Sequence, residues 1–594
     1  MNRRLILSVL CVSSVGLHLW GAETPTTNTA GGTAAPTAAA SNAPASNAPV
    51  ATAEDLKQLR EKIAQQEEEI KRLQKSIEDQ QKILERSMQN AAAAQPAGNS
   101  TATADGTPVV ATKSAPDQNA PVQLVPAVNV PRPRVAFGRN AWQHPEAAPS
   151  ALSVSIGNTT FTPLGFVDAT FFARSTNVGS GIGTNFAGIP YSTAAAGHLS
   201  ETSFSAQNSR FGIRIDSNFV GAKILGYLET DFLFNNDANS FQITSNSAGL
   251  RLRNYFVDMQ KGSFEIMGGQ DWSFLTPNRK GLSPLPADIF YTQNMDTNYQ
   301  LGLTWTRAPQ FRFIGHFSED FALGVALENP QQYIGGGSGA STVTLPNNLS
   351  ASLQPQFQYS PGLNVANTIT NIPNLFPDVI FKGAYDAHAG DKIDHIEAAA
   401  VVRGFKDYVT STTAPAIQGS HTAVGYAGAI NGNFEIIKNV HLIANTYFGQ
   451  GGGRYIFGVA PDVIVRPDGS ISPLHSYSTV DGVEAQVSKN TLLAMYYGGA
   501  YIGKNITFDP TASGSTLAKP VYAGYGTPGS TVTRDVQEIT FDWVQTLWKN
   551  PNYGALSLIN QYSYIWKEPW YFSSTTPRQA HSNIIYVDLR YTLP

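Results

Sequence analysis

Polar and apolar side chains alternate in Arg210-Phe211-Gly212-Ile213-Arg214-Ile215-Asp216. The same alternation occurs in Leu250-Arg251-Leu252-Arg253-Asn254-Tyr255-Phe256 and in residues 585–593 at the chain end. Successive side chains of a β-strand point to opposite faces of the sheet, so each stretch predicts a strand with one apolar and one charged face. A soluble sandwich would turn the charged face to water. A membrane-spanning barrel turns the apolar face to lipid and the charged face to its lumen.

The composition favours the barrel. Only 14% of the 594 residues are charged, against about 25% in an average globular protein, while 52 glycines, 24 tyrosines and 30 phenylalanines supply turns and strands. After residue 22 no apolar run reaches the roughly 18 residues of a transmembrane helix, so only a closed barrel could span a bilayer. The net charge of −4 gives no basic surface, so no nucleic-acid partner is expected.

Several segments are expected before the barrel domain, which is placed at 152–594. Residues 1–22 carry two arginines before an apolar run and end on small residues, which predicts a secretory signal peptide. The Ala-, Thr- and Pro-rich residues 23–53 predict a disordered spacer, and residues 89–151 predict an Ala/Pro-rich linker. The only cysteine, Cys11, lies in the signal peptide, so the mature chain is expected to have no disulfide and no cysteine metal site.

Residues 54–88 predict an α-helical coiled coil of nearly five heptads. Aliphatic side chains that would form its core recur at a 3-4 spacing: Leu56, Leu59, Ile63, Ile70, Leu73, Ile77 and Leu84. A single solvated helix is the alternative, but it would leave this stripe in water at roughly 1.5 to 3 kcal/mol for each large side chain. Self-association is therefore expected. Isoleucine at heptad position a with leucine at position d would suggest a dimer. Glutamines occupy two of the d positions, so the oligomer number stays open.

About sixteen antiparallel strands are predicted from residue 152 onward, joined alternately by tight turns and by long Gly-, Ser-, Thr- and Asn-rich loops. This alternation, with both barrel ends on the periplasmic side, is typical of outer-membrane barrels. The predicted strands are 164–175, 202–217, 222–234, 248–259, 263–272, 298–317, 321–328, 377–388, 393–405, 422–436, 440–449, 477–488, 491–503, 532–548, 554–566 and 582–593.

Charged residues are expected to line the lumen of this barrel. Sixteen strands enclose an aqueous channel, whereas eight would be filled by side chains. Four arginines on neighbouring strands share the polar parity and are expected to line the pore and favour anions: Arg210, Arg214, Arg251 and Arg253. The alternative is that they stiffen the wall by pairing with acids of these strands and of the strand between them: Asp216, Glu229, Asp231 and Asp258. Farther round the wall the inward charges are of mixed sign: Asp378, Lys382, Asp386, Glu397, Arg403, Glu538, Asp542, Asp588 and Arg590.

The segment 273–298 follows the fifth predicted strand and is therefore the third outer loop. It contains the charged residues Arg279, Lys280, Asp288 and Asp296. In general porins the third outer loop folds into the channel. By analogy with that family, these four residues are expected to lie at a constriction.

Four motifs carry a resemblance to the DcaP-like outer-membrane porins. They are Ser209-Arg210-Phe211-Gly212-Ile213, Glu229-Thr230-Asp231-Phe232, Leu250-Arg251-Leu252-Arg253-Asn254-Tyr255 and Gly268-Gly269-Gln270-Asp271-Trp272-Ser273. The match is most specific over residues 164–330, and beyond that it lies in the order of signal peptide, coiled coil, linker and barrel.

The resemblance implies a trimeric porin with a trimeric coiled coil, which passes small, preferably anionic solutes such as dicarboxylates by passive diffusion. It would assign the family's lumenal arginines to Arg210, Arg251 and Arg253, while Arg214 is added from strand parity alone. The chain departs from the usual pattern by ending on Leu593-Pro594, where outer-membrane barrels usually end on an aromatic residue.

Other functions compete with the channel. The ten histidines are scattered and neither H-E-x-x-H nor G-x-S-x-G occurs, so no enzyme, cofactor or metal is expected. A sugar-selective porin is one alternative. It would need aromatic side chains in the lumen, and strand parity predicts that Tyr255 faces inward. A structural tether is another, in which the coil reaches peptidoglycan. The expected location is the bacterial outer membrane with the coil in the periplasm, and the expected partners are lipid, a homotrimer and small hydrophilic solutes.

Overall fold

The computed structural model describes most of the chain after residue 149. The described residues are 150–234, 248–285, 299–336, 340–349, 374–390, 392–411 and 416–594, with isolated residues 68, 71, 75, 82, 353 and 356. The predicted signal peptide, the spacer, all seven core residues of the coiled coil and nearly all of the linker lie outside them. Of the coil segment only Glu68, Lys71, Lys75 and Lys82 are described, as exposed helical residues, so the structure gives the coiled coil no support.

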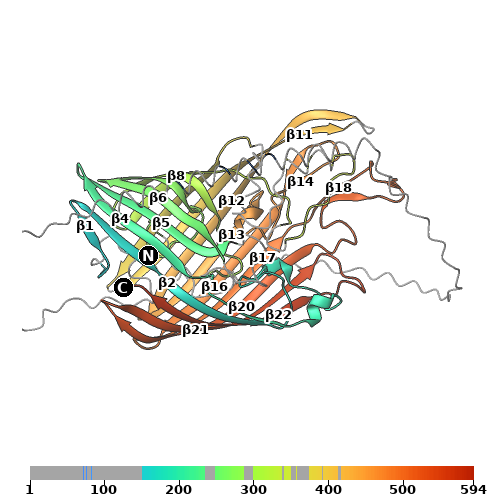
Figure 1. Cartoon of the computed structure of the whole chain (residues 1–594). Coiled ribbons are helices and arrows are strands. Elements are labelled where there is room, and N and C mark those ends of the chain that lie inside the picture. The colour runs from blue at the N-terminus through green and yellow to red at the C-terminus, as the bar shows by residue number, and fades with distance from the viewer. Residues whose placement is uncertain are drawn as a thin grey trace, which may run out of the picture. The chain divides into compact units, whose positions relative to one another are not determined.

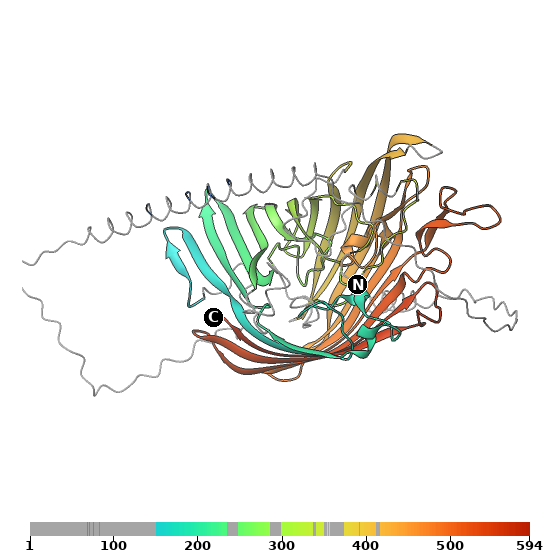
Figure 2. The same cartoon turned by 45° about the vertical axis from the view of Figure 1, so that its right-hand side comes forward.

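The described strands form one closed antiparallel barrel (Figures 1 and 2). Eighteen strands are hydrogen-bonded in a single sheet, and β2 (Thr159–Arg174) closes it by pairing with β22 (Ala580–Thr592). β1 (Val154–Ile156) is a short hairpin partner of β2. β3 (Glu201–Ser205) and β4 (Arg210–Phe219) both pair with β2 and are two parts of one wall strand. The wall therefore has sixteen strands.

The remaining wall strands follow one another round the barrel in chain order. They are β5 (Ala222–Phe234), β6 (Gly249–Lys261), β7 (Phe264–Trp272), β8 (Arg307–His316), β9 (Phe321–Glu328), β10 (Asp378–Ala389), β11 (Lys392–Ser411), β12 (Ile417–Ile437), β13 (Val440–Gln450), β16 (His475–Gln486), β17 (Thr491–Ile502), β20 (Thr533–Asn550) and β21 (Gly554–Pro569).

Smaller elements lie in the long connections. The pairs β14 (Val463–Val465) with β15 (Ile471–Pro473), and β18 (Asn505–Phe508) with β19 (Tyr522–Tyr525), form separate two-stranded sheets. The short 3-10 helices are η1 (Phe186–Gly188), η2 (Ala195–His198) and η5 (Gly453–Tyr455).

The predicted sixteen-stranded wall is confirmed, with one strand placed partly wrong. The prediction of a strand over 298–317 is incorrect at its start, because β8 begins only at Arg307. Residues 300–306 alternate in sequence like a strand, but side chains of both parities are buried in the structure. A wall strand exposes every second side chain to lipid. This stretch therefore lies inside the barrel rather than in its wall.

Tight turns lie at one end of the barrel and long connections at the other (Figure 1). The turn after β4 uses positive φ at Val220 and Gly221, and the turn after β12 uses it at Asn439, as two-residue hairpins require. Both ends of the described barrel meet on the turn side, where the Ser150 hydroxyl donates to the Pro594 carbonyl at 2.5 Å.

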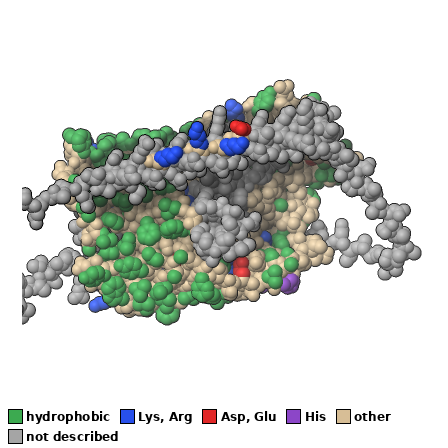
Figure 3. All heavy atoms as spheres, viewed as in Figure 1, with side chains coloured by type: hydrophobic (Ala, Val, Ile, Leu, Met, Phe, Trp, Pro, Cys, Tyr) green, Lys and Arg blue, Asp and Glu red, His purple; other side chains and the backbone are tan. Residues whose placement is uncertain are grey.

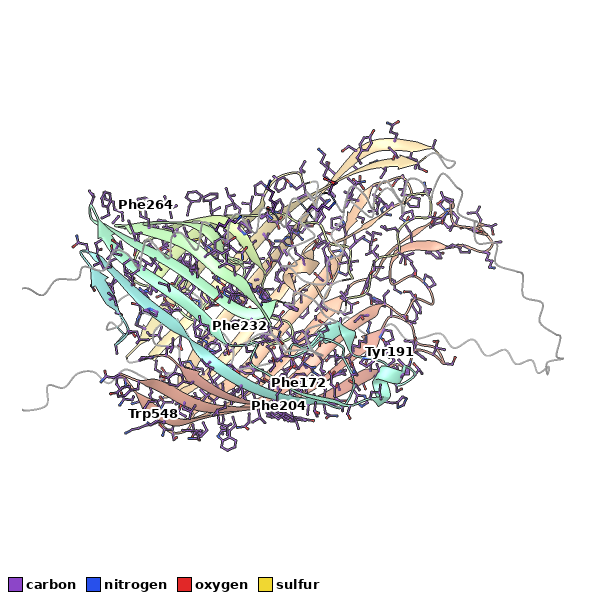
Figure 4. All side chains as sticks on the ribbon, in the orientation of Figure 1. Phe172, Tyr191, Phe204, Phe232, Phe264 and Trp548 are labelled. Atoms are coloured by element: carbon purple, nitrogen blue, oxygen red, sulfur yellow. The ribbon has the colours of Figure 1, made fainter. Side chains whose placement is uncertain are left out.

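The barrel is apolar outside and charged inside. Along β4 the guanidinium-bearing Arg210 and Arg214 are buried, whereas Phe211 and Ile213 between them are exposed. Figure 3 accordingly shows many hydrophobic side chains on the part of the outer wall that is visible. Figure 4 shows Phe264 near the turn end of this wall, and its side chain is 75% exposed. This arrangement, the reverse of a soluble protein, matches a lipid-facing surface. Among the described residues no helix is both long and apolar enough to cross a membrane.

Candidate functional site

The connection between β7 and β8 folds into the lumen. We call residues 273–306 the constricting segment, of which 273–285 and 299–306 are described. The Phe274 amide donates to Glu328 on β9 at 2.6 Å, and the Lys382 ammonium group on β10 donates to the Thr276 carbonyl at 2.7 Å. The segment thus leaves β7 and passes along the inner face of strands that are two and three places away.

The constricting segment also reaches the strands on the far side of the sheet order. Arg279 donates to both carboxylate oxygens of Glu484 on β16, at 2.9 and 2.5 Å. The Gln300 side chain and the Leu301 amide donate to Glu538 on β20, at 2.9 and 3.2 Å. Since these contacts join the segment to several sides of the wall, a solute crossing the barrel would have to pass beside it.

A glycine in the segment explains how closely it can lie against the wall. Gly302 has φ +89°, and a Cβ there would come within 2.3 Å of the Thr479 carbonyl oxygen of β16. Only glycine combines this backbone conformation with so close an approach. Of the four residues expected at the constriction, Arg279 binds the wall and the neighbouring Lys280 is exposed, whereas Asp288 and Asp296 lie outside the described residues.

A second set of buried groups joins the segment to β10 and β11. The Asn278 and Gly281 amides donate to Glu397 and Asp386, at 3.2 and 3.0 Å. The two carboxylates are linked by His395, whose ring nitrogens lie 2.6 Å from Asp386 and 3.2 Å from Glu397. Strand parity predicted that Asp386 and Glu397 face inward, but not that His395 links them, because an isolated histidine in the sequence gives no indication of its partners.

The arginine cluster, defined as Arg210, Arg214, Arg251 and Arg253, lies on the inner face of β4 and β6. Each of the four has a carboxylate partner. Arg253 contacts Glu229 and Asp231 at 2.6 Å each, Arg251 contacts Asp231 at 2.6 Å, Arg214 contacts Asp216 at 2.7 Å, and Arg210 lies 4.0 Å from Glu229. The structure therefore brings the cluster together with three of the four acids named as its alternative partners.

Tyr255 does not lie in the lumen, and the parity prediction for it is wrong. Glu229 of β5 pairs with Asn254, but the next residue, Thr230, pairs with Leu252, so Arg253 is an extra residue in β6. This β-bulge turns both Arg253 and Asn254 inward and moves Tyr255 to the exposed face. The aromatic expected for a sugar-selective lumen is therefore on the outer surface.

The outer connections meet at a buried ionic group, of which the sequence predicted the inward Arg403 and Asp378 but not the loop residues Asp462 and Tyr455. Arg403 of β11 contacts Asp378 at 3.0 Å and Asp462, in the β13–β16 connection, at 2.7 Å. The Tyr455 hydroxyl donates to Asp378 at 2.9 Å, and the Trp305 amide donates to the Tyr455 carbonyl at 2.9 Å. Burial raises the pKa of the Asp462 carboxyl, and the adjacent Arg403 guanidinium offsets part of that shift. The β13–β16 connection is thus fixed to both the wall and the constricting segment.

A group of acids, which we call the acid patch, lines β16 and β20. It consists of Glu484, Glu538 and Asp542, all on the inner face and no more than 4% exposed. Within the described part of the chain, no three His, Cys, Asp or Glu side chains are grouped so that they could hold a metal ion. The charged groups of the lumen thus include the paired arginines on β4 and β6 and this acid patch on β16 and β20.

Comparisons with known proteins give weak similarity. No family model and no curated protein matches the sequence. Similar solved structures include the outer membrane channel DcaP of Acinetobacter baumannii, at 15% identity and a TM-score of 0.49, with 74% of this chain and 98% of that chain covered. The anion-selective porin from Comamonas acidovorans has 10% identity and a TM-score of 0.40, with 73% and 99% covered. These values do not place the chain in the DcaP-like family. The evidence for the barrel is the strand pairing of this chain itself.

Proposed function

We propose that this protein is an outer-membrane channel through which small hydrophilic solutes diffuse passively. The observation that carries the proposal is the inverted wall, with apolar side chains on the outer face and ionisable side chains on the inner face of a closed sixteen-stranded barrel. A barrel of this size encloses an aqueous lumen unless something fills it. The constricting segment narrows that lumen and selects solutes by size and charge.

Anions, including dicarboxylates, are the solutes that we propose the channel prefers. Among the described residues, the four guanidinium groups of the arginine cluster contact three carboxylates, those of Asp216, Glu229 and Asp231, which is one negative charge fewer than the positive charges. Positive groups at a narrow, poorly screened passage raise the local concentration of anions. Because each arginine is also paired, we expect a modest preference rather than strict exclusion of cations.

A homotrimer is the assembly that we propose, with residues 54–88 as a coiled coil that holds the three chains together in the periplasm. The heptad pattern of seven large aliphatic residues supports self-association. The barrel motifs resemble those of DcaP-like porins, and this resemblance supports a trimer over other oligomers.

The experiment that tests the proposal is electrical recording of the purified full-length protein in planar lipid bilayers under a potassium chloride gradient. We expect discrete conductance steps, three equal closing steps for each inserted assembly, and a reversal potential shifted toward that of chloride. A correctly folded barrel that inserts and never conducts would contradict the channel. Single, independent steps would contradict the trimer and leave the channel in place.

A further inference from the structure

One carboxylate of the acid patch has no partner among the described residues. Asp542 of β20 is 3% exposed, and neither of its carboxylate oxygens makes a hydrogen bond to any residue that the structure describes. An ionised carboxylate is costly to bury unless a cation or hydrogen-bond donors compensate its charge. Asp542 therefore either retains a proton or binds a cation that enters the lumen.

The strand register places a second carboxylate in line with Asp542. Glu484 of β16 pairs with Ala494 of β17, and Ala494 pairs with Asp542, so the three residues form one row across three strands. Neighbouring strands lie about 4.8 Å apart, which puts the two carboxyl-bearing residues roughly 10 Å apart along the wall. Ala494, whose side chain is a methyl group, is the residue between them in this row.

The charges around this row are mainly negative. Glu484 receives hydrogen bonds from Arg279 and from the Tyr496 hydroxyl, the latter at 2.7 Å. Glu538 lies on the same face of β20 and receives hydrogen bonds from the constricting segment. Glu484 and Glu538 thus receive hydrogen bonds, whereas Asp542 receives none from the residues that the structure describes.

We propose that Asp542, facing Glu484 across Ala494, forms a binding site for a monovalent cationic group inside the lumen. The occupant is an alkali ion or the ammonium group of a permeating solute, both of which are held by carboxylate oxygens. A chelated metal does not fit, because no three ligating side chains are grouped among the described residues. The site rests on the proposed function to the extent that cations reach it through the pore.

The test compares two variants of the full-length protein in planar bilayers, under gradients of potassium chloride and of methylammonium chloride. Asp542→Asn removes the unpartnered charge. Asp535→Asn, on the same strand, removes an equal charge that is already paired with Arg534 at 2.8 Å. We expect Asp542→Asn to lower the cation-to-anion permeability ratio by at least about fivefold, because one unit charge some 4 Å from an ion has about that effect in water and a larger one at a buried site. Asp535→Asn should leave the ratio close to that of the unmodified channel.

The salts identify the source of the cationic group. A change with potassium alone indicates an alkali ion, and a change with methylammonium alone indicates an ammonium site. Equal ratios for the unmodified channel and Asp542→Asn in both salts would overturn the site and indicate a protonated carboxyl.

A measurement that does not need conduction separates this inference from the channel. Crystals of the full-length protein grown in rubidium chloride should show anomalous density beside Asp542, and crystals of Asp542→Asn should lack it. Absence of conductance would refute the proposed function and leave the rubidium result to decide the site. Density that is absent beside Asp542 in the unmodified protein would overturn the site.

Discussion

Replacing Arg253 by methionine should destabilise the barrel far more than the same change at Arg214. The Arg253 guanidinium is fully buried and contacts two fully buried carboxylates, Glu229 and Asp231, at 2.6 Å each. Removing one member of a buried ion pair costs about 3–5 kcal/mol, because the remaining charge is left without compensation. Arg214 pairs instead with Asp216, whose side chain is 40% exposed, so water can solvate that carboxylate once Arg214 is removed, and the loss should be close to that of an exposed pair, about 0–1 kcal/mol.

The assay is urea unfolding of the barrel refolded in lipid vesicles, followed by tryptophan fluorescence. We expect the free energy of unfolding to fall by about 3–5 kcal/mol for Arg253→Met and by no more than about 1 kcal/mol for Arg214→Met. Adding Glu229→Gln to Arg253→Met should recover part of the loss, since it removes one of the uncompensated charges. Equal, small losses for both arginine variants would refute the reasoning and leave these residues to act on permeating ions alone.

Three further predictions concern selectivity, the constriction and the outer connections. Replacing Arg251 and Arg253 together with alanine should reduce the anion preference, and an unchanged reversal potential in a salt gradient would refute the proposed role of the arginine cluster. Arg279→Gln removes charge-assisted hydrogen bonds to Glu484, worth about 1.5–3 kcal/mol each, so the constricting segment should move more freely and single-channel noise and mean conductance should rise; unaltered recordings would contradict a constriction held there. Arg403→Met leaves buried acids uncompensated, so protease added outside vesicles should cut the β13–β16 connection faster than in the unmodified protein. Equal cleavage rates for the two proteins would contradict a connection held by the buried ionic group around Arg403.

The strands of the barrel were predictable because a wall one layer thick imposes a simple rule on sequence. Every second side chain faces lipid, so alternation marks a strand wherever it runs undisturbed, as over Arg210–Phe219 and Ala222–Phe234. The rule fails where local geometry breaks it. The bulge at Arg253 turns Tyr255 from the inner to the outer face of the wall. No residue type in that stretch indicates that the strand contains an extra residue.

Segments inside the lumen were harder to predict because they follow no period. Residues 300–306 look like a strand in sequence, yet they are buried on both sides by the wall around them. The group around Asp462 and Tyr455 joins residues more than 70 positions apart in the chain, such as Asp378 and Tyr455. Its members are ordinary loop residues until the fold brings them together. The sequence indicated which residues face inward, and the structure adds which of them are partners.

The most direct test of the central claim, that ions cross the barrel beside the constricting segment, uses two single-cysteine variants. The chain after the predicted signal peptide has no cysteine. Lys280→Cys places a thiol on the constricting segment, between residues bound to opposite parts of the wall, and Met495→Cys places one on the outer face, where Met495 is 48% exposed. A charged, water-soluble thiosulfonate reagent added during single-channel recording should change the conductance of Lys280→Cys and leave that of Met495→Cys unchanged. If the thiol at residue 280 is shown to have reacted and the conductance is unchanged, passage through the lumen is contradicted.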